Sequence, residues 1–171
     1  GRLKITPQAT QIEELINNII EENRPLAISR NCEVKFIHPS KYLEKISLDQ
    51  SLIRQVLINL ISNAIKYSKE DGEKNLVEIK LEVRQANLII SVKDRGVGIP
   101  LRDQHPIFDK FDRVANAKIE GSGLGLYIAK MIVEASGGRI WFFSQESLGT
   151  TFYVSLPLAG TKAKEGEKTL N

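Results

Sequence analysis

A predicted helix in the first half of the chain carries polar residues whose types and spacing suit metal and phosphate chemistry. The stretch QVLINLISNAIKYS, residues 55–68, places Asn59, Asn63 and Lys66 at intervals of four and three residues. Each asparagine disfavours a helix by roughly a few tenths of a kcal/mol relative to alanine, because its amide competes for backbone groups. An amide oxygen suits Mg²⁺, and a lysine one turn away can neutralise phosphates. The helix alone fits either a magnesium–phosphate site or two solvated boundary asparagines.

Two glycine-rich segments favour the ligand-binding interpretation. In DRGVGIP, residues 94–100, Asp94 ends a predicted strand and glycines follow it. A carboxylate there can accept a hydrogen bond from the amino group of a base, and glycines let backbone approach a flat ring, although D-x-G is also common in turns. GSGLGL, residues 121–126, precedes a helix and can turn backbone amides toward phosphate. It lacks the Gly-Lys-Ser/Thr of a P-loop and the β-α-β context of a Rossmann fold.

Hydrophobic periodicity predicts three helices, each with one buried face. The first spans residues 8–24, the second carries the asparagines, and the third spans residues 124–136 before a Gly-Gly pair ends it. The second helix begins near SLDQ, where Ser47 and Gln50 fit a capping box and Asp49 is the alternative cap. Asn63 falls at the edge of its apolar stripe and Asn59 just beyond it, where a helix that covers a sheet can also line a pocket. Six residues form the predicted stripe: Ile53, Val56, Leu57, Leu60, Ile61 and Ala64.

Alternating segments predict strands, and a long aperiodic stretch separates them. Two pairs, 76–84 with 87–94 and 139–145 with 150–157, are most simply antiparallel. Earlier segments, 32–38 before Pro39 and 42–47, predict two shorter strands. Residues 94–121 show little periodicity, which is typical of a functional loop. We therefore expect an α+β fold, a two-layer sandwich in which a mixed, mostly antiparallel sheet of about five strands packs against three helices.

Composition fits one soluble domain and excludes several classes of protein. The chain has 171 residues, of which 42% are hydrophobic and 26% charged, so it is long enough for one core and is not disordered overall. No apolar run reaches a membrane span and no signal peptide is visible, so we expect a cytoplasmic domain without direct membrane contact, from a parent protein that is free or membrane-bound. The mild net charge of +3 argues against nucleic acid as a partner. Cys32, the single cysteine, is expected to be a small half-buried or buried residue.

Four motifs in order resemble the catalytic ATP-binding domain of bacterial sensor histidine kinases, within the GHKL superfamily that has the Bergerat fold. NLISNAIKYS is similar to the N box, DRGVGIP to the G1 box, FDKFDRV to the F box and GSGLGL to the G2 box. The resemblance continues to the final predicted strands and covers about residues 45–157. It implies a junction at residues 1–7 and a catalytic domain over residues 8–158. The small, charged and aperiodic residues 159–171 predict a disordered tail.

The resemblance implies roles for residues at matching positions, with ATP and Mg²⁺ as cofactors. Asn63 would bind Mg²⁺, Asn59 and Lys66 would face the phosphates, and Arg113 would approach the terminal phosphate. Asp94 would bond the adenine amino group, with Tyr67 and Thr150 near the base. The other nucleotide-binding positions would be those of the G1 and G2 boxes, whose glycines shape the pocket and the lid hinges: Gly96, Gly98, Ile99, Gly121, Gly123, Leu124, Gly125 and Leu126.

Some of these roles have simpler alternatives. The stretch 101–120 would be a mobile ATP lid, in which Phe108 and Phe111 either anchor the lid, touch a neighbouring helical hairpin or are ordinary core residues. Arg113 would otherwise be a solvated loop charge, and Thr150 an ordinary strand residue.

The histidine that such a kinase phosphorylates is missing from the motifs. His38 is expected to end a strand and His105 to lie at the solvated start of the lid, so neither fits the acceptor motif. The expected enzyme is a protein histidine kinase domain that transfers the γ-phosphoryl group of ATP to a histidine on an absent dimerisation hairpin, in a two-component phosphorelay with a response regulator. It is not expected to phosphorylate itself alone. Other GHKL ATPases, a serine-phosphorylating anti-sigma kinase and a degenerate regulatory module are the alternatives.

Overall fold

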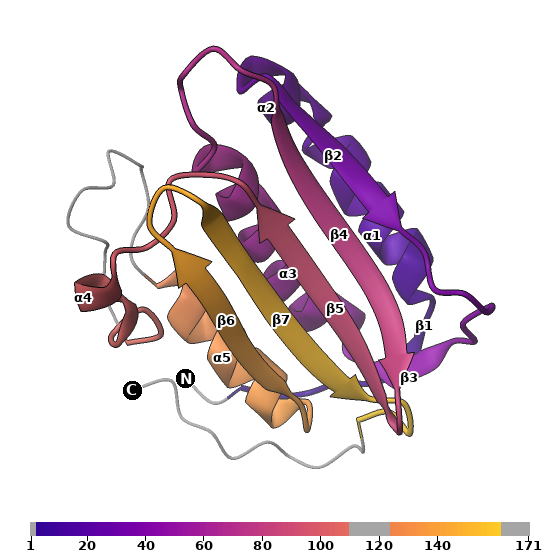
Figure 1. Ribbon diagram of the computed structural model, residues 1–171. Helices are drawn as coiled ribbons and strands as arrows, with labels where there is room; N and C mark the ends of the chain where they lie inside the picture. The colour runs from indigo at the N-terminus through magenta and orange to yellow at the C-terminus, as the bar shows by residue number, and fades with distance from the viewer. Residues whose placement is uncertain (1–2, 110–123, 162–171) are drawn as a thin grey trace.

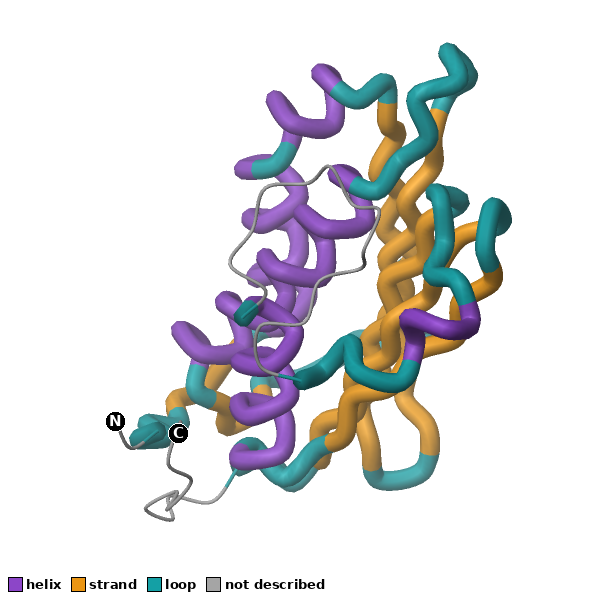
Figure 2. The backbone as a smooth tube through the Cα atoms, turned by 90° about the vertical axis from the view of Figure 1, so that its left-hand side faces the viewer, coloured by secondary structure: helices purple, strands orange, loops and turns teal. Residues whose placement is uncertain are grey.

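The described residues form two layers, a sheet and a set of helices on one of its faces (Figures 1 and 2). The computed structural model describes residues 3–109 and 124–161. The elements, in chain order, are β1 (Gln8–Thr10), α1 (Ile12–Glu22), α2 (Arg24–Ser29), β2 (Cys32–Ile37), β3 (Ile46–Leu48), α3 (Gln50–Lys66), β4 (Asn75–Arg84), β5 (Asn87–Asp94), α4 (Leu101–Gln104), α5 (Gly125–Ala135), β6 (Arg139–Gln145) and β7 (Gly149–Pro157).

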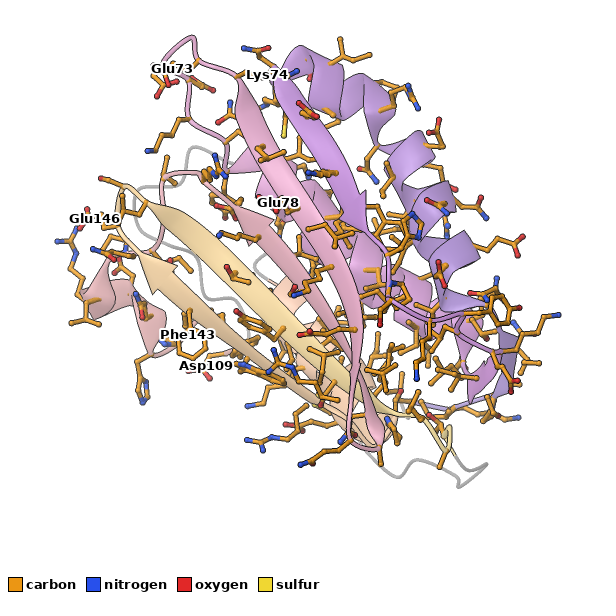
Figure 3. The ribbon with its side chains drawn as sticks, turned by 45° about the vertical axis from the view of Figure 1, so that its right-hand side comes forward. Glu73, Lys74, Glu78, Asp109, Phe143 and Glu146 are labelled. Carbon is orange, nitrogen blue, oxygen red and sulfur yellow. The ribbon has the colours of Figure 1, made fainter. Side chains whose placement is uncertain are left out.

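The main sheet has five strands in the order β2-β4-β5-β7-β6. Strand β2 runs parallel to β4, and the other neighbouring pairs are antiparallel, which confirms a mixed, mostly antiparallel sheet. Alternate residues of β4 and β5, such as Val77 and Ile90, are buried beneath the helices. Glu78 and Phe143 project from the opposite face, which no helix of the described segments covers (Figure 3).

Helix α3 is the central helix of the second layer, in contact with both α1 and α5. The six residues predicted to form its apolar stripe are all buried: Ile53, Val56, Leu57, Leu60, Ile61 and Ala64. Burial of a large aliphatic side chain contributes about 1.5–3 kcal/mol, so this stripe fixes the helix against the sheet. The asparagines on the stripe's edge are thereby held at a fixed depth beside the core.

The first predicted helix is shorter than its periodicity indicated, and a strand precedes it. Residues 8–10 form β1, which pairs antiparallel with β3, so the prediction of a helix over 8–24 was wrong at its start. Gln11 caps α1 by accepting a hydrogen bond from the N–H of Glu13. A second helix, α2, follows Asn23 with a proline in its first turn, a position that proline tolerates. The short strand predicted over 42–47 was wrong for residues 42–45, because β3 begins only at Ile46 and runs to Leu48.

Asp49, and not the Ser47 capping box, caps α3. One carboxylate oxygen, Oδ1, accepts the N–H of Leu52 at 3.1 Å, and the other, Oδ2, accepts the N–H of Thr6 at 2.7 Å. The carboxylate is buried at the positive end of the helix, where a negative charge is stabilised. The same side chain therefore starts α3 and holds the N-terminal segment against it.

Both ends of the described chain pack onto the domain more closely than the predicted boundaries allow. Ile5 is buried, although residues 1–7 were expected to be a junction. Thr161 donates its N–H to the Ser47 carbonyl at 2.7 Å and its hydroxyl to the Ser136 carbonyl at 3.1 Å. The expected tail is thus ordered over 159–161, and residues 162–171 lie outside the described part.

The structure also describes the single cysteine and the lengths of the helices. Cys32 is half-buried as predicted, and burial raises the pKa of its thiol. Within the described residues, no helix is long and apolar enough to cross a membrane.

Candidate nucleotide-binding site

Asp94 ends β5 as a buried carboxylate that faces the helical layer. It continues the alternation of Leu88, Ile90 and Val92, whose side chains point to the same side and fill the core. Its Oδ1 accepts two backbone N–H groups, from Gly96 at 2.9 Å and from Thr150 at 3.1 Å. With Oδ1 saturated in this way, Oδ2 remains to accept a hydrogen bond from a ligand.

Burial raises the pKa of Asp94 to about 6, and the hydrogen bonds from Gly96 and Thr150 lower it only in part. Desolvation disfavours the charged carboxylate, whereas each N–H donor favours it. A donor group of a ligand that reached Oδ2 would stabilise the charged form further. A strongly perturbed acid in such a position is a candidate binding residue on physical grounds.

Glycines let three segments approach one another closely around this acid. A Cβ on Gly96 would lie 2.1 Å from the Tyr67 carbonyl oxygen, and one on Gly149 would lie 2.2 Å from the Asp94 carbonyl oxygen. Gly98 has φ +65°, and a Cβ there would meet the Gln145 carbonyl oxygen at 2.1 Å. The loop after β5 is therefore compressed between the end of α3 and the β6–β7 turn, and only glycine fits these positions.

Two residues that sequence reasoning did not select, Ser144 and Gln104, complete this end of the site. Ser144 Oγ accepts the N–H of Ile99 at 2.8 Å and lies 2.7 Å from Thr150 Oγ1. Gln104 Nε2 donates to the carbonyls of Ile99, at 2.9 Å, and of Ser144, at 3.1 Å. A serine in a strand and a glutamine at the end of a one-turn helix match no motif, because their role depends on which segments pack together.

The two asparagines of α3 form a pair in which each amide has a defined orientation. Asn63 Nδ2 donates to Asn59 Oδ1 at 3.2 Å. This bond turns the Asn63 oxygen and the Asn59 amino group toward other partners. Asn59 Nδ2 is buried and has no hydrogen-bond partner among the described residues. A buried amide donor without a partner is unfavourable by about 1–3 kcal/mol, so it favours a ligand with acceptor oxygens.

Gly125 brings the first turn of α5 against this pair. A Cβ at this position would lie 2.5 Å from Asn59 Oδ1, so the contact depends on the missing side chain. Asn59 and Gly125 also line a groove of about 400 Å³ between α3 and α5, with Arg54, Gln55 and Ile128 among its other walls. Of the asparagine pair, Asn59 is the member that lines this groove.

Lys66 and Tyr67 end α3 between the asparagines and the acid. Both side chains are half-buried, and burial raises the pKa of the Tyr67 hydroxyl. The Tyr67 carbonyl accepts the N–H of Val97 at 3.2 Å, which ties the helix end to the loop after β5. The end of α3, where Lys66 supplies a cation, is thus tied to the loop that follows the acid.

Comparisons with known proteins agree on one family. The model of the histidine kinase-, DNA gyrase B- and HSP90-like ATPase family matches residues 48–160. The chain belongs to this ATPase family. Sensor histidine kinase WalK of Bacillus subtilis (strain 168) is 49% identical over 115 residues, which are 66% of this chain and 19% of WalK. The chain therefore spans about a fifth of the length of that relative.

Solved histidine kinases share the fold. The full-length ShkA structure, in complex with AMPPNP, gives a TM-score of 0.80 at 25% identity and covers 96% of this chain and 34% of the ShkA chain. Histidine kinase ThkA in complex with the response regulator TrrA gives 0.73 at 26% identity and covers 90% of this chain and 42% of that chain. The chain thus shares the family's fold with these solved histidine kinases.

The residues present fit the Mg²⁺ and phosphates that this ATPase family implies. Among the described segments, no group of three or more His, Cys, Asp or Glu residues could hold a metal ion by itself. Mg²⁺ commonly takes only one or two protein ligands and completes its coordination with water and substrate phosphates. One Asn63 oxygen beside the unpartnered Asn59 amide and Lys66 matches that requirement.

Several predicted ATPase-site residues lie outside the described segments: Phe111, Arg113, Gly121 and Gly123. Leu124 precedes α5 directly, and Leu126 is half-buried against the core. The structure thus brings together Asp94, Tyr67 and Thr150 at one end and the asparagines with Gly125 at the other.

Phe108 and the two histidines occupy the positions expected of them. The Phe108 ring contacts Phe142 and Phe152 edge-on, with centroids 5.9 and 6.3 Å away, so it packs onto the sheet. His38 directly follows β2, where its Nδ1 lies 2.9 Å from Glu13, and His105 is exposed after α4. Neither histidine adjoins the asparagine pair or Asp94 through any hydrogen bond among the described residues.

Proposed function

We propose that this chain binds Mg-ATP between Asp94 and the Asn59–Asn63 pair, and that it transfers the γ-phosphoryl group to a histidine on a separate helical hairpin. The observation that carries the proposal is Asp94, whose buried carboxylate keeps one oxygen available. The nucleotide bound in the related ShkA structure, AMPPNP, is an ATP analogue.

The chemistry of Asp94 favours adenine over guanine. Adenine carries an amino group, a hydrogen-bond donor, at the position where guanine carries a carbonyl oxygen. Because Asp94 Oδ1 is occupied by two N–H groups, Oδ2 offers an acceptor in a site where water is largely excluded. An adenine amino group satisfies that acceptor, while a guanine carbonyl would leave a buried charge facing a second acceptor.

The asparagine pair presents two different groups to the polyphosphate. Asn63 Oδ1 is the protein ligand we assign to Mg²⁺, and Asn59 Nδ2 is the donor we assign to a phosphate oxygen. Lys66 adds a positive charge on the same helix. Bound Mg²⁺ would neutralise phosphate charge, and the chain's own part is to hold the phosphates in place, which is most of what phosphoryl transfer asks of a protein.

We assign the groove between α3 and α5 as the side from which the acceptor histidine reaches the phosphates. Its wall includes Asn59, so a helix placed in it would lie beside the terminal phosphate. We further propose a response regulator as the next partner, since the related kinase ThkA was solved in complex with the response regulator TrrA. We assign the domain to the cytoplasm, where ATP is found.

The test mixes this chain with labelled ATP, Mg²⁺ and the separately expressed dimerisation hairpin of Bacillus subtilis WalK. We expect label on the hairpin histidine only when both proteins are present, and none with an Asn59→Leu variant. Controls are the hairpin alone and a hairpin in which the acceptor histidine is glutamine. ATP binding without any transfer to the hairpin would contradict the kinase proposal and leave only a nucleotide-binding domain.

A further inference from the structure

Gln104 joins two segments that lie far apart in the sequence. Its single side-chain amide nitrogen donates to the carbonyls of Ile99, in the loop after β5, and Ser144, near the end of β6. Ser144 in turn accepts the N–H of Ile99 on its hydroxyl. Both backbone polar groups of Ile99 are therefore fixed against β6, one by Ser144 and one by Gln104.

These contacts continue without interruption to the acid at the base end of the site. Ser144 Oγ lies 2.7 Å from Thr150 Oγ1, and the Thr150 N–H donates to Asp94 Oδ1 at 3.1 Å. The loop between Asp94 and Ile99 is consequently tied at both ends to the β6–β7 hairpin. Between these ties Val97 donates its N–H to the Tyr67 carbonyl at 3.2 Å and accepts the Ser147 N–H at 2.7 Å. The glycines on either side of Val97, Gly96 and Gly98, allow the backbone other shapes once a tie is lost.

Helix α4 itself makes few contacts that could fix the position of Gln104. The helix is one turn of four residues, contains no buried residue and has no side-chain cap. Leu101, in the same turn, is 85% exposed. Apolar packing within the turn itself is therefore slight, and the two hydrogen bonds of Gln104 link it to Ile99 and to β6. The buried Ile107 and the Phe108 ring pack just beyond the turn.

We propose that Gln104 is a positioning residue for base recognition, which holds the loop from Asp94 to Ile99 in the shape that binds the nucleotide base. The proposal rests on the ATP site proposed above and adds a residue that touches neither base nor phosphate. Without the Gln104 amide the loop samples other shapes, and binding must select the competent one from among them. Because the adenosine half of the ligand is common to AMP and ATP, both should weaken by the same factor.

The experiment measures AMP and ATP affinities of the full chain by competition against a fluorescent ATP analogue, beside the unfolding temperature. Gln104→Leu removes the donor and keeps the size, and Gln104→Glu keeps the shape and replaces the donor by an acceptor. Gln145→Leu, at an exposed side chain on the end of β6, is the matched control. We expect both Gln104 variants to bind AMP and ATP about tenfold more weakly, which corresponds to the loss of one to two hydrogen bonds.

The pH dependence separates positioning from a loss of packing. A protonated glutamate carries one O–H donor. The loss of AMP and ATP affinity caused by Gln104→Glu should therefore become smaller as the pH falls toward 5, whereas the loss caused by Gln104→Leu should not change. A lower unfolding temperature with unchanged affinities would overturn the proposal, as would loss of ATP binding with AMP binding intact. A wild-type chain that binds neither nucleotide would instead refute the ATP site, and the positioning role with it.

Discussion

The charged carboxylate of Asp94 destabilises the folded domain because it is buried, so the stability of the domain should depend on pH. Its pKa lies near 6 because burial disfavours the charge, above the value of an exposed aspartate. Between those two pKa values the folded protein binds more protons than the unfolded chain does. The free energy of unfolding that this group contributes is therefore fully present at low pH and is lost as the pH rises through about 6.

The first prediction uses Asp94→Asn, in which the remaining carbonyl oxygen can still accept the two N–H groups. The variant should gain stability relative to wild type by up to about 3 kcal/mol between pH 4 and pH 7, because it lacks the titrating carboxylate. Denaturant unfolding at several pH values measures this difference. A constant difference across the range would show that Asp94 is not desolvated in the folded protein.

Gly125→Ala provides the second prediction, at the phosphate end. The added Cβ would displace the Asn59 side chain, which lies 2.5 Å from it, while alanine itself favours the helix. We expect ATP affinity to fall about tenfold, AMP affinity to remain nearly constant and the domain to stay folded. The control is Gly137→Ala at the other end of α5, where φ is +82°. It should reduce stability without changing ATP affinity.

Among individual residues of the candidate site, the sequence singled out those that belong to motifs and missed those whose role depends on tertiary contacts. The residue types and spacings of Asp94 and the two asparagines indicate ligand binding even without a structure. Ser144 and Gln104 gain their significance because the β6–β7 hairpin packs beside the loop after β5. A single sequence does not reveal that proximity.

Helix α3 is the element that sets the geometry of the site, since it carries the asparagines, Lys66 and Tyr67. Its position depends on the apolar stripe and on the cap at its first turn. Periodicity predicted the stripe because 3.6 residues per turn dictate which side chains share a face. Periodicity did not decide between Ser47 and Asp49 as the cap, because that depends on backbone angles at the helix start.

The third prediction separates the two caps. Asp49→Ala removes hydrogen bonds to the N–H groups of Leu52 and Thr6, so it should lower the free energy of unfolding by about 2 kcal/mol. Ser47→Ala, at an exposed side chain, should change it by less than about 0.5 kcal/mol. Equal effects of the two substitutions in a denaturant titration would contradict the assignment of Asp49.

Element boundaries were harder to predict than element types. The range predicted as one helix, residues 8–24, contains β1, the cap Gln11 and α1, and α2 begins at its last residue. Strand β1 was missed because it exists only through its pairing with β3. Three residues are too few to show a period. The strands of the main sheet, which alternate over seven or more residues in β4, β5, β6 and β7, were predicted nearly to their ends.

For the molecule as a whole, both ends of the described chain meet at β3 and the start of α3. Thr6 binds Asp49, and Thr161 binds Ser47 and, at the end of α5, Ser136. The composition of residues 159–171 predicted disorder, but composition does not show that the first three residues of that stretch find buried partners. Contacts at both ends therefore stabilise the start of α3, the helix that carries Asn59 and Asn63.

The fourth prediction compares two shortened chains. A chain that ends at residue 158 loses both hydrogen bonds of Thr161 and the burial of Gly160, whereas one that ends at residue 161 keeps them. The shorter chain should be less stable by about 1–3 kcal/mol, measured by denaturant unfolding. Chains of equal stability would show that this segment is not part of the domain.

The central claim is that the domain recognises adenine through Asp94 and binds phosphates at the asparagine pair. Calorimetric titration of the folded chain with ATP and with GTP, each in the presence of Mg²⁺, tests this most directly when Asp94→Asn is titrated beside the wild type. The account predicts that wild type binds ATP and not GTP, and that the folded variant loses ATP binding. Equal binding of both nucleotides, or ATP binding that survives in the variant, would contradict it.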